Sequence, residues 1–236
     1  MSLAHEPTSA NQQQLWDELH ALRDSDGNLV GRSLVDEPNE LAINLGERLV
    51  DGSSIVEVGC ANGRDARYWA LHKGMLVHAL DFSQAAIDQL RELAEDQGVG
   101  LLIQAGLFDA SEDSLPVDID SQDAFYARSS LHVTSYRLTH LLRETHNVLH
   151  LGGIVAIEGK HIEDPKIKRS ISLDPDDPFL LSDPLEGGHI RRAWEPEYTR
   201  HILKMVGFEI TDLEVINEHP THGEPSVFTR VIAVKT

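Results

Sequence analysis

The sequence is poor in the residues that form cross-links, bind polyanions or cross a membrane. Cys60 is the single cysteine among 236 residues, so no disulfide can form within the chain and a reducing compartment is expected. Lys and Arg total 20 against 39 Asp and Glu, a formal net charge of −19. This acidity argues against nucleic acid and anionic membrane surfaces as partners, because both attract basic surfaces. Uncharged apolar runs are strand-sized, and the first residues lack a signal-peptide pattern. We therefore expect a cytoplasmic protein.

A hydrophobic fraction of 41% supports a full core, and strand-like and helix-like segments alternate along the chain. Helices are predicted at 11–23, 38–49, 64–72, from 84 onward, at 134–149 and at 195–206. Strands are predicted at 54–59, 75–80, 101–104, 123–127, 152–158, 208–215 and 227–234. Alternation predicts an α/β fold with a largely parallel sheet, and the two consecutive final strands predict an antiparallel hairpin.

A single domain with four parts is expected. Residues 1–50 form an N-terminal helical cap, 51–159 the ligand-binding core, and 195–236 a C-terminal helix and hairpin. Residues 160–194, rich in Asp and Pro, interrupt the alternation and are predicted to lack regular structure. A loop of this length in a compact domain is usually functional or disordered, so it is interpreted as an insertion on the substrate side.

The most informative segment links the first predicted strand to the helix after it, in the sequence VEVGCANGRD at 56–65. Gly59, Ala61 and Gly63 are small enough to let a ligand approach the backbone at a helix N-terminus. The spacing fails the dinucleotide fingerprint at its third glycine. However, Asp81 ends the next predicted strand, where an acid can accept hydrogen bonds from both ribose hydroxyls. A tight turn without any ligand is the alternative.

Five segments together resemble the class I S-adenosylmethionine-dependent methyltransferases. They are EVGCANGRD at 57–65, HALDFS at 78–83, QAGLFDA at 104–110, DAFYARSSLH at 123–132 and HLGGIVAIE at 150–158. The resemblance implies a Rossmann-like sheet of seven strands with helices on both faces, and S-adenosylmethionine as cofactor. It implies a cofactor site made of Glu57, Gly59, Cys60, Ala61, Gly63, Asp81, Phe82, Leu107, Phe108, Arg128 and Ser129.

Within that implied site, each end of the cofactor has its own residues. Glu57 supports the turn and the methionine ammonium, near backbone groups of Arg128 and Ser129. Asp81 holds the ribose. The adenine end is covered by Phe82 on one face and by Leu107 with Phe108 on the other. Gly106 departs from the family, which often has an acid near the adenine amine.

The resemblance implies methyl transfer to an O, N or S atom. No Asn/Asp-Pro-Pro-Tyr run follows the fourth strand, which together with the acidity favours a small-molecule acceptor over nucleic acid. Two alternatives remain open at this point. One is an aminopropyltransferase on the same fold, and the other is a non-catalytic S-adenosylmethionine-binding regulator. The oligomeric state is left open.

Candidate residues for the acceptor side follow the fourth strand and the insertion. His132 is the candidate general base, because an imidazole takes up a proton near neutral pH; a structural histidine is the alternative. His161, His189, Arg191 and Arg192 are candidate substrate ligands, since arginine forks suit an anionic group; a solvated mixed-charge loop is the alternative. Trp16 either covers the pocket or packs in the core. No metal site is expected, because His146 and His150 lack a third ligand.

Overall fold

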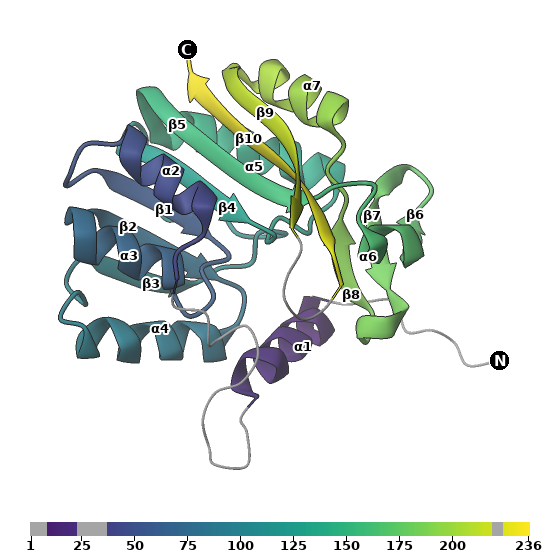
Figure 1. The fold of residues 1–236 in the computed structure, drawn as a ribbon, viewed down its shortest axis with the longest axis horizontal. Helices are drawn as coiled ribbons and strands as arrows, with labels where there is room; N and C mark the ends of the chain where they lie inside the picture. The colour runs from purple at the N-terminus through teal and green to yellow at the C-terminus, as the bar shows by residue number, and fades with distance from the viewer. Residues whose placement is uncertain (1–8, 23–36, 219–223) are drawn as a thin grey trace.

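A seven-stranded sheet forms the centre of the computed structural model, which describes residues 9–22, 37–218 and 224–236 (Figure 1). Its strands are β1 Ser54–Val58, β2 Leu76–Asp81, β3 Ile103–Leu107, β4 Gln122–Arg128, β5 Leu149–Lys160, β9 Phe208–Glu218 and β10 Ser226–Lys235, in the order β3-β2-β1-β4-β5-β10-β9. Strands β1 to β5 are parallel, and β10 runs antiparallel to both β5 and β9. The predicted sheet and its terminal hairpin are confirmed.

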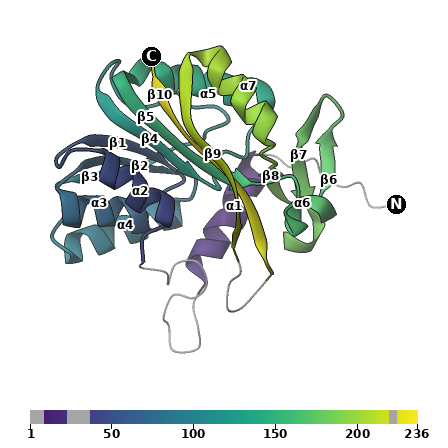
Figure 2. The ribbon, with the colours of Figure 1, turned by 45° about the horizontal axis from the view of Figure 1, so that its top comes forward.

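Helices cover both faces of this sheet (Figure 2). One face packs against α2 Glu40–Arg48, α3 Arg64–Lys73 and α4 Gln84–Asp96, and the other against α5 Ser135–Val148 and α7 Pro196–Val206. Successive side chains of a strand point to opposite faces. Ile55 therefore joins Trp69 in one core, while Val56 joins Leu138 in the other, and all four are fully buried.

The carboxyl ends of the parallel strands lie together where the strand order reverses between β1 and β4. Val58 is in register with Leu80 of β2 and Ala127 of β4, so Gly59, Asp81 and the residues after β4 meet at one edge. This reversal is where open α/β sheets bind ligands. Helix α1, Ser9–Ala21, lies at this edge, in contact with α4 on one side and β8 on the other (Figure 1).

The insertion is ordered, which corrects the prediction that 160–194 lacks regular structure. It contains α6 Pro165–Arg169, β6 Ile171–Asp174, β7 Asp177–Asp183, the 3₁₀ turn η2 Pro184–Glu186 and β8 His189–Arg192. The strands form a separate antiparallel sheet in the order β6-β7-β8. Strands β6 and β8 have four residues each, too few for a hydrophobic pattern to predict a strand. Buried ion pairs replace that pattern, as in Arg192 with Asp177, at 3.2 Å between NH1 and Oδ2.

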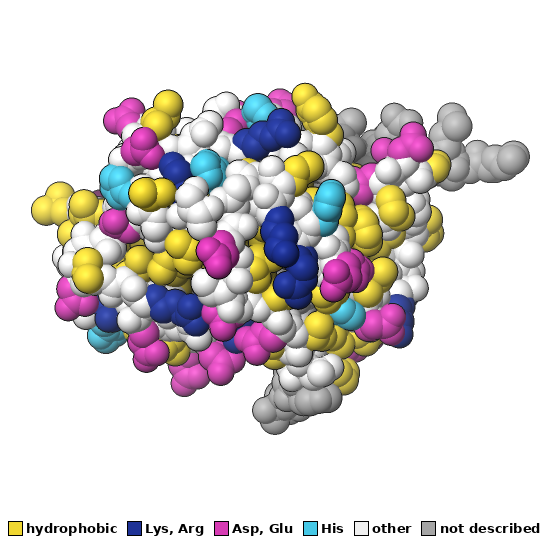
Figure 3. Space-filling model, turned by 90° about the horizontal axis from the view of Figure 1, so that it is seen from above, with side chains coloured by type: hydrophobic (Ala, Val, Ile, Leu, Met, Phe, Trp, Pro, Cys, Tyr) yellow, Lys and Arg dark blue, Asp and Glu magenta, His cyan; other side chains and the backbone are white. Residues whose placement is uncertain are grey.

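Two strands start more than one residue away from the predicted position. The third strand begins at Ile103 rather than 101, because Leu101 is fully exposed in the turn before it. Strand β5 begins at Leu149, three residues before the paired glycines. No helix in the described ranges is long and apolar enough to cross a membrane. Acidic side chains are dispersed over the face in Figure 3, with Lys and Arg between them.

Candidate active site

The turn between β1 and α3 has a left-handed backbone at three positions. Gly59, Ala61 and Gly63 have φ values of +81°, +50° and +74°, a region that favours glycine. A Cβ on Gly59 would lie 2.0 Å from the Cβ of Ser130, and a Cβ on Gly63 would lie 2.0 Å from Cδ1 of Leu90. The two glycines are thus required by the protein's own packing, which draws the loop after β4 and helix α4 tightly onto the turn.

The Asp81 carboxylate, at the end of β2, is fixed across this turn. Its Oδ2 accepts the Ala61 N–H at 2.8 Å, and its Oδ1 accepts the Ser83 N–H at 2.9 Å. Burial raises the pKa of Asp81, and these backbone hydrogen bonds oppose that rise. Each carboxylate oxygen has a second lone pair. The group can therefore accept two hydroxyl donors in addition to the two amides, which suits the ribose of the implied cofactor.

The Glu57 carboxylate, near the end of β1, lacks a full set of hydrogen bonds. It is 3% exposed, and its Oε2 has no hydrogen-bond partner among the described residues. Burial, then the charge of Asp65, raises the pKa of Glu57 well above its ordinary value, and Arg64 offsets part of that rise. A buried acceptor without a donor is unfavourable, and a ligand ammonium would supply one. The residues present therefore fit the methionine end of S-adenosylmethionine.

A Glu57→Gln variant is expected to stabilise the ligand-free protein at neutral pH. With its folded pKa raised, Glu57 binds more protons in the folded state, so stability falls as pH rises from about 4.5, its ordinary value, through the raised value. The neutral amide removes this loss. The thermal midpoint at pH 7 should rise by about 2–4 °C per kcal/mol gained, while cofactor affinity falls. Calorimetry and thermal unfolding at pH 5 and 8 test this, with exposed Glu47→Gln as control; equal shifts in both variants would contradict it.

The Asp65 carboxylate organises the start of α3 and was missed from the sequence. It is 4% exposed. Its Oδ1 accepts the Asn39 N–H at 2.8 Å and Arg64 Nε–H at 2.9 Å, and its Oδ2 accepts the Tyr126 hydroxyl at 3.0 Å. Asp65 ends the motif at 57–65, so an acid directly inside the helix after the turn was the available signal. Its bonds join α2, α3 and β4 behind the turn.

The end of β4 offers backbone rather than side chain to the turn. Arg128 directs its guanidinium away, with Nε 2.7 Å from Oε1 of Glu158. Ser129 is left-handed at φ +52°, and its N–H donates to the Glu158 carbonyl at 2.7 Å. Cys60 is buried, and burial raises the pKa of its thiol. A neutral thiol in the turn is a packing group rather than a nucleophile.

The residues assigned to adenine differ in how exposed their side chains are. Phe82 is half-buried after β2. Phe108 is 3% exposed and packs in the core, while Leu107 is 51% exposed. The Phe108 N–H donates to the Asp81 carbonyl at 2.8 Å, so the segment does lie beside Asp81. Because the Phe108 ring points into the core, Leu107 is the member of the pair that can meet a ligand.

Helix α1 is held over the strand ends by polar contacts that the sequence did not indicate. Asp17 Oδ1 accepts the Ser83 hydroxyl at 2.6 Å, beside Asp81. Gln12 reaches the other side, donating to the Gly188 carbonyl at 3.1 Å and accepting the Ile190 N–H at 3.0 Å. The helix therefore bridges the cofactor side of the sheet and β8.

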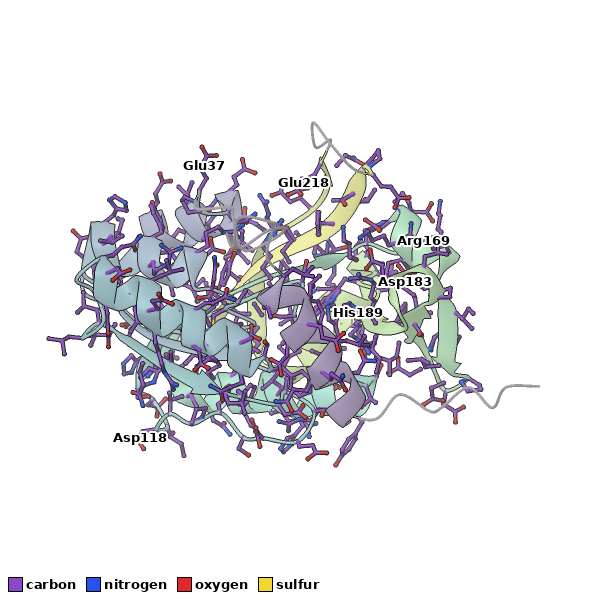
Figure 4. The ribbon with its side chains drawn as sticks, turned by 90° about the horizontal axis from the view of Figure 1, so that it is seen from below. Glu37, Asp118, Arg169, Asp183, His189 and Glu218 are labelled. Atoms are coloured by element: carbon purple, nitrogen blue, oxygen red, sulfur yellow. The ribbon has the colours of Figure 1, made fainter. Side chains whose placement is uncertain are left out.

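Trp16 lies at the centre of a ring cluster under α1. Its indole is 4.8 Å from the His189 ring and 6.3 Å from the His132 ring, the latter nearly parallel at 10°. Figure 4 shows His189 between α1 and the small sheet. His132 follows the loop whose Ser130 contacts the glycine turn. Three residues predicted for the acceptor side are thus brought together next to the proposed cofactor site.

Arg192 is not available for an anionic ligand, which corrects its predicted role. It is fully buried, with NH1 2.8 Å from the Val133 carbonyl and 3.2 Å from Asp177 Oδ2, and NH2 2.6 Å from Ser135 Oγ. It joins β8 to the start of α5. His161 also has a structural contact, since its Nδ1 accepts the Glu163 N–H at 3.0 Å.

Arg191 lines a pocket between α1 and the insertion. The pocket has a volume of about 500 Å³, and its walls are Leu15, Glu18, Leu19, Leu22, Lys166, Glu186, His189 and Arg191. Arg191 pairs with Glu186 and lies 3.9 Å from Asp183 Oδ2. These charges gather at the small sheet, where Arg169 and Asp183 also lie (Figure 4). The predicted basic residues are neither a solvated loop nor a bare cationic site, because carboxylates neutralise them.

Comparisons with known proteins show what the chain is similar to. Residues 55–153 match the methyltransferase domain family. The sarcosine/dimethylglycine N-methyltransferase of Halorhodospira halochloris is 28% identical over 188 residues, 80% of this chain and 61% of that protein. The enzyme of that name from Aphanothece halophytica is 31% identical over 102 residues, 43% of this chain and 36% of that protein. The chain thus spans less than two thirds of either relative.

A solved structure shares the fold over nearly the whole length. The 4+2 cyclase SpnF superposes with a TM-score of 0.71 at 20% identity, covering 97% of both chains. At that identity the likeness shows the fold alone, and the support for a family comes from the sequence matches. These findings support a class I S-adenosylmethionine-dependent methyltransferase, a fold and family that imply S-adenosylmethionine as cofactor.

Proposed function

We propose that this protein transfers the methyl group of S-adenosylmethionine to the nitrogen of a small amine. The observation that carries the proposal is the pair of buried carboxylates on adjacent strands: Asp81 is bonded to both Ala61 and Ser83, and one oxygen of Glu57 lacks a donor within residues 9–22, 37–218 and 224–236. Nitrogen is chosen among O, N and S because both curated relatives bear the name of N-methyltransferases.

Glu57 would hold the ammonium of the cofactor, the backbone of the Gly59–Gly63 turn its methionine chain, and Asp81 its ribose. Bound there, the cofactor supplies an electrophilic methyl group. The chain's own contribution is to place the nucleophile and to exclude water. Helix α1 suits both tasks, because it covers the strand ends and brings Trp16 against His132 and His189.

Titration calorimetry tests the cofactor half of the proposal. S-adenosylmethionine and its demethylated product are expected to bind, and the decarboxylated form to bind more weakly. Product formation across a panel of small amines, alcohols and thiols then tests the acceptor. Tighter binding of the decarboxylated form together with aminopropyl transfer would contradict the proposal, as would binding without turnover of any amine in the panel. The first result would point to an aminopropyltransferase, and the second to a regulatory cofactor-binding protein.

An anionic group on the amine is part of the proposal, with Arg191 as its contact. Such a group would compete with Glu186 for the guanidinium. Arg191→Ala is expected to raise KM for a carboxylate-bearing amine tenfold or more, since a charged hydrogen bond contributes about 1.5–3 kcal/mol. KM for an uncharged analogue should stay the same. Lys168→Ala, which removes an exposed cation paired with Glu163, is the control. A uniform change in KM for both amines would exclude the contact.

A further inference from the structure

The His132 imidazole is held between α1 and the small sheet. Its ring stacks on Trp16, and its Nδ1 accepts the backbone N–H of Arg192 at 3.3 Å. Arg192 itself is immobilised by its bonds to Val133, Ser135 and Asp177. The donor at Nδ1 is therefore a fixed main-chain group of β8.

A backbone N–H can only donate, so it decides which nitrogen of His132 carries the proton. In a neutral imidazole one nitrogen is a donor and the other an acceptor. With Nδ1 accepting, the hydrogen is on Nε2. A histidine that acts as general base through Nε2 has the opposite arrangement, with Nδ1–H donating to a carboxylate. Protonating Nδ1 would also set one N–H against another.

We propose that His132 is a positioning residue that presents an Nε2–H donor to an atom of the methyl acceptor other than the attacking nitrogen, and not a base. The acceptor is then an amine whose lone pair is already free, rather than a hydroxyl that must lose a proton to the enzyme. The inference rests on the proposed function. The new bond joins nitrogen to the methyl carbon as the carbon–sulfur bond breaks, its electron pair stays on sulfur, and nitrogen takes the positive charge. Any N–H proton leaves afterwards to water.

Other titratable groups surround this loop, and their effects on a pH profile of activity must be distinguished from that of His132. They are Asp17 and His20 of α1, His189 of β8 and Asp177 of β7. Asp17 and Asp177 already accept hydrogen bonds from Ser83 and Ser135. With no base in the step, kcat/KM should rise with pH up to the amine's own pKa and follow that value when the amine is changed.

The tautomer can be read without any activity. In protein labelled with ¹⁵N-histidine, long-range proton–nitrogen correlation spectra at pH 8 should show His132 as the Nε2–H form, with its signals assigned by their loss in His132→Asn. An Nδ1–H form would overturn the inference. This result stands whether or not the acceptor is an amine, so failure of the proposed function and failure of the inference are distinguishable.

Matched variants test the role. His132→Gln keeps a donor near the position of Nε2, whereas His132→Asn keeps only a group near Nδ1. Gln is expected to retain kcat and KM within a fewfold, and Asn to raise KM about tenfold with little loss of kcat, as for one lost hydrogen bond. Product affinity by calorimetry should be equal in both. A general base contributes about a hundredfold or more to kcat. His132 is therefore a base if both variants lose kcat by that factor and if the pH profile of kcat/KM no longer shows a titration that comes from the protein.

Discussion

An Asp81→Asn variant is expected to bind S-adenosylmethionine and its demethylated product about a hundredfold more weakly than the unmodified protein. Both oxygens of this carboxylate already accept backbone amides, so the ribose hydroxyls would add two charge-assisted hydrogen bonds. At about 1.5 kcal/mol each, their loss corresponds to roughly two factors of ten. Calorimetry with the product measures this directly.

Asp88→Asn is the matched control for that loss. Asp88 lies on α4, the helix that follows Asp81 in the chain, its side chain is 64% exposed, and it pairs with Arg91 at 3.6 Å. Exposed pairs contribute little, so this variant should bind as the unmodified protein does. Asp81→Asn also turns an amide NH₂ toward the N–H of Ala61 or Ser83, which can lower the stability of the fold. The thermal midpoints of the variant and the unmodified protein must therefore be compared at the same ligand concentration. Unchanged affinity in Asp81→Asn would remove Asp81 from the cofactor site.

The places of the proposed cofactor residues could be predicted from the sequence, because these residues lie within a few positions of strand ends. The alternation of apolar residues predicts β1 and β2, and the turn and Asp81 follow directly from where those strands stop. Parallel neighbours in register then bring Asp81 beside Ala61. The same local logic failed for Phe108, because which side of the strand end a ring faces depends on the core behind it.

The acceptor half could not be predicted, because its contacts join segments distant in sequence. The tautomer of His132 is decided by an amide 60 residues away, on a strand that hydrophobic patterning does not reveal. Arg192 resembled an exposed anion ligand because its partner, Asp177, lies on another strand of the same small sheet. Buried charge on short strands produces the composition of a solvated loop, and only the pairing distinguishes the two.

The proposed cofactor binding and the stability of the fold favour different residues at the turn. Glu57 and Asp81 are buried, and burial raises the pKa of both carboxyl groups, so each charge reduces the stability of the ligand-free fold. Gly59 and Gly63 contribute in the other direction, since they let Ser130 and Leu90 pack against the backbone. The glycines therefore have a structural function that is separable from ligand approach, and a comparison of two glycines can measure it.

Gly59→Ala is expected to destabilise the protein far more than Gly52→Ala. The two glycines have φ values of +81° and +84°, so the backbone cost of about 1–2 kcal/mol is shared. A Cβ on Gly52 meets nothing within 4 Å, whereas one on Gly59 lies 2.0 Å from Ser130 Cβ and 2.6 Å from its Oγ. Overpacking adds about 1–3 kcal/mol. At about 2–4 °C per kcal/mol, Gly59→Ala should lose roughly twice the thermal midpoint that Gly52→Ala loses.

A compensating change separates collision from backbone strain. Ser130→Gly removes the atoms that an added Cβ would meet, and alone it also loses the hydrogen bond from Ser130 Oγ to the Val58 carbonyl, at 2.5 Å. The double variant of Gly59→Ala with Ser130→Gly should therefore lose less unfolding free energy than the two single variants lose together. The difference should be about 1 kcal/mol or more, because neighbours in contact usually couple. Strict additivity in a double-mutant cycle would show that the left-handed backbone alone requires glycine at 59. Product affinity should recover with stability, because the loop after β4 can again close on the turn.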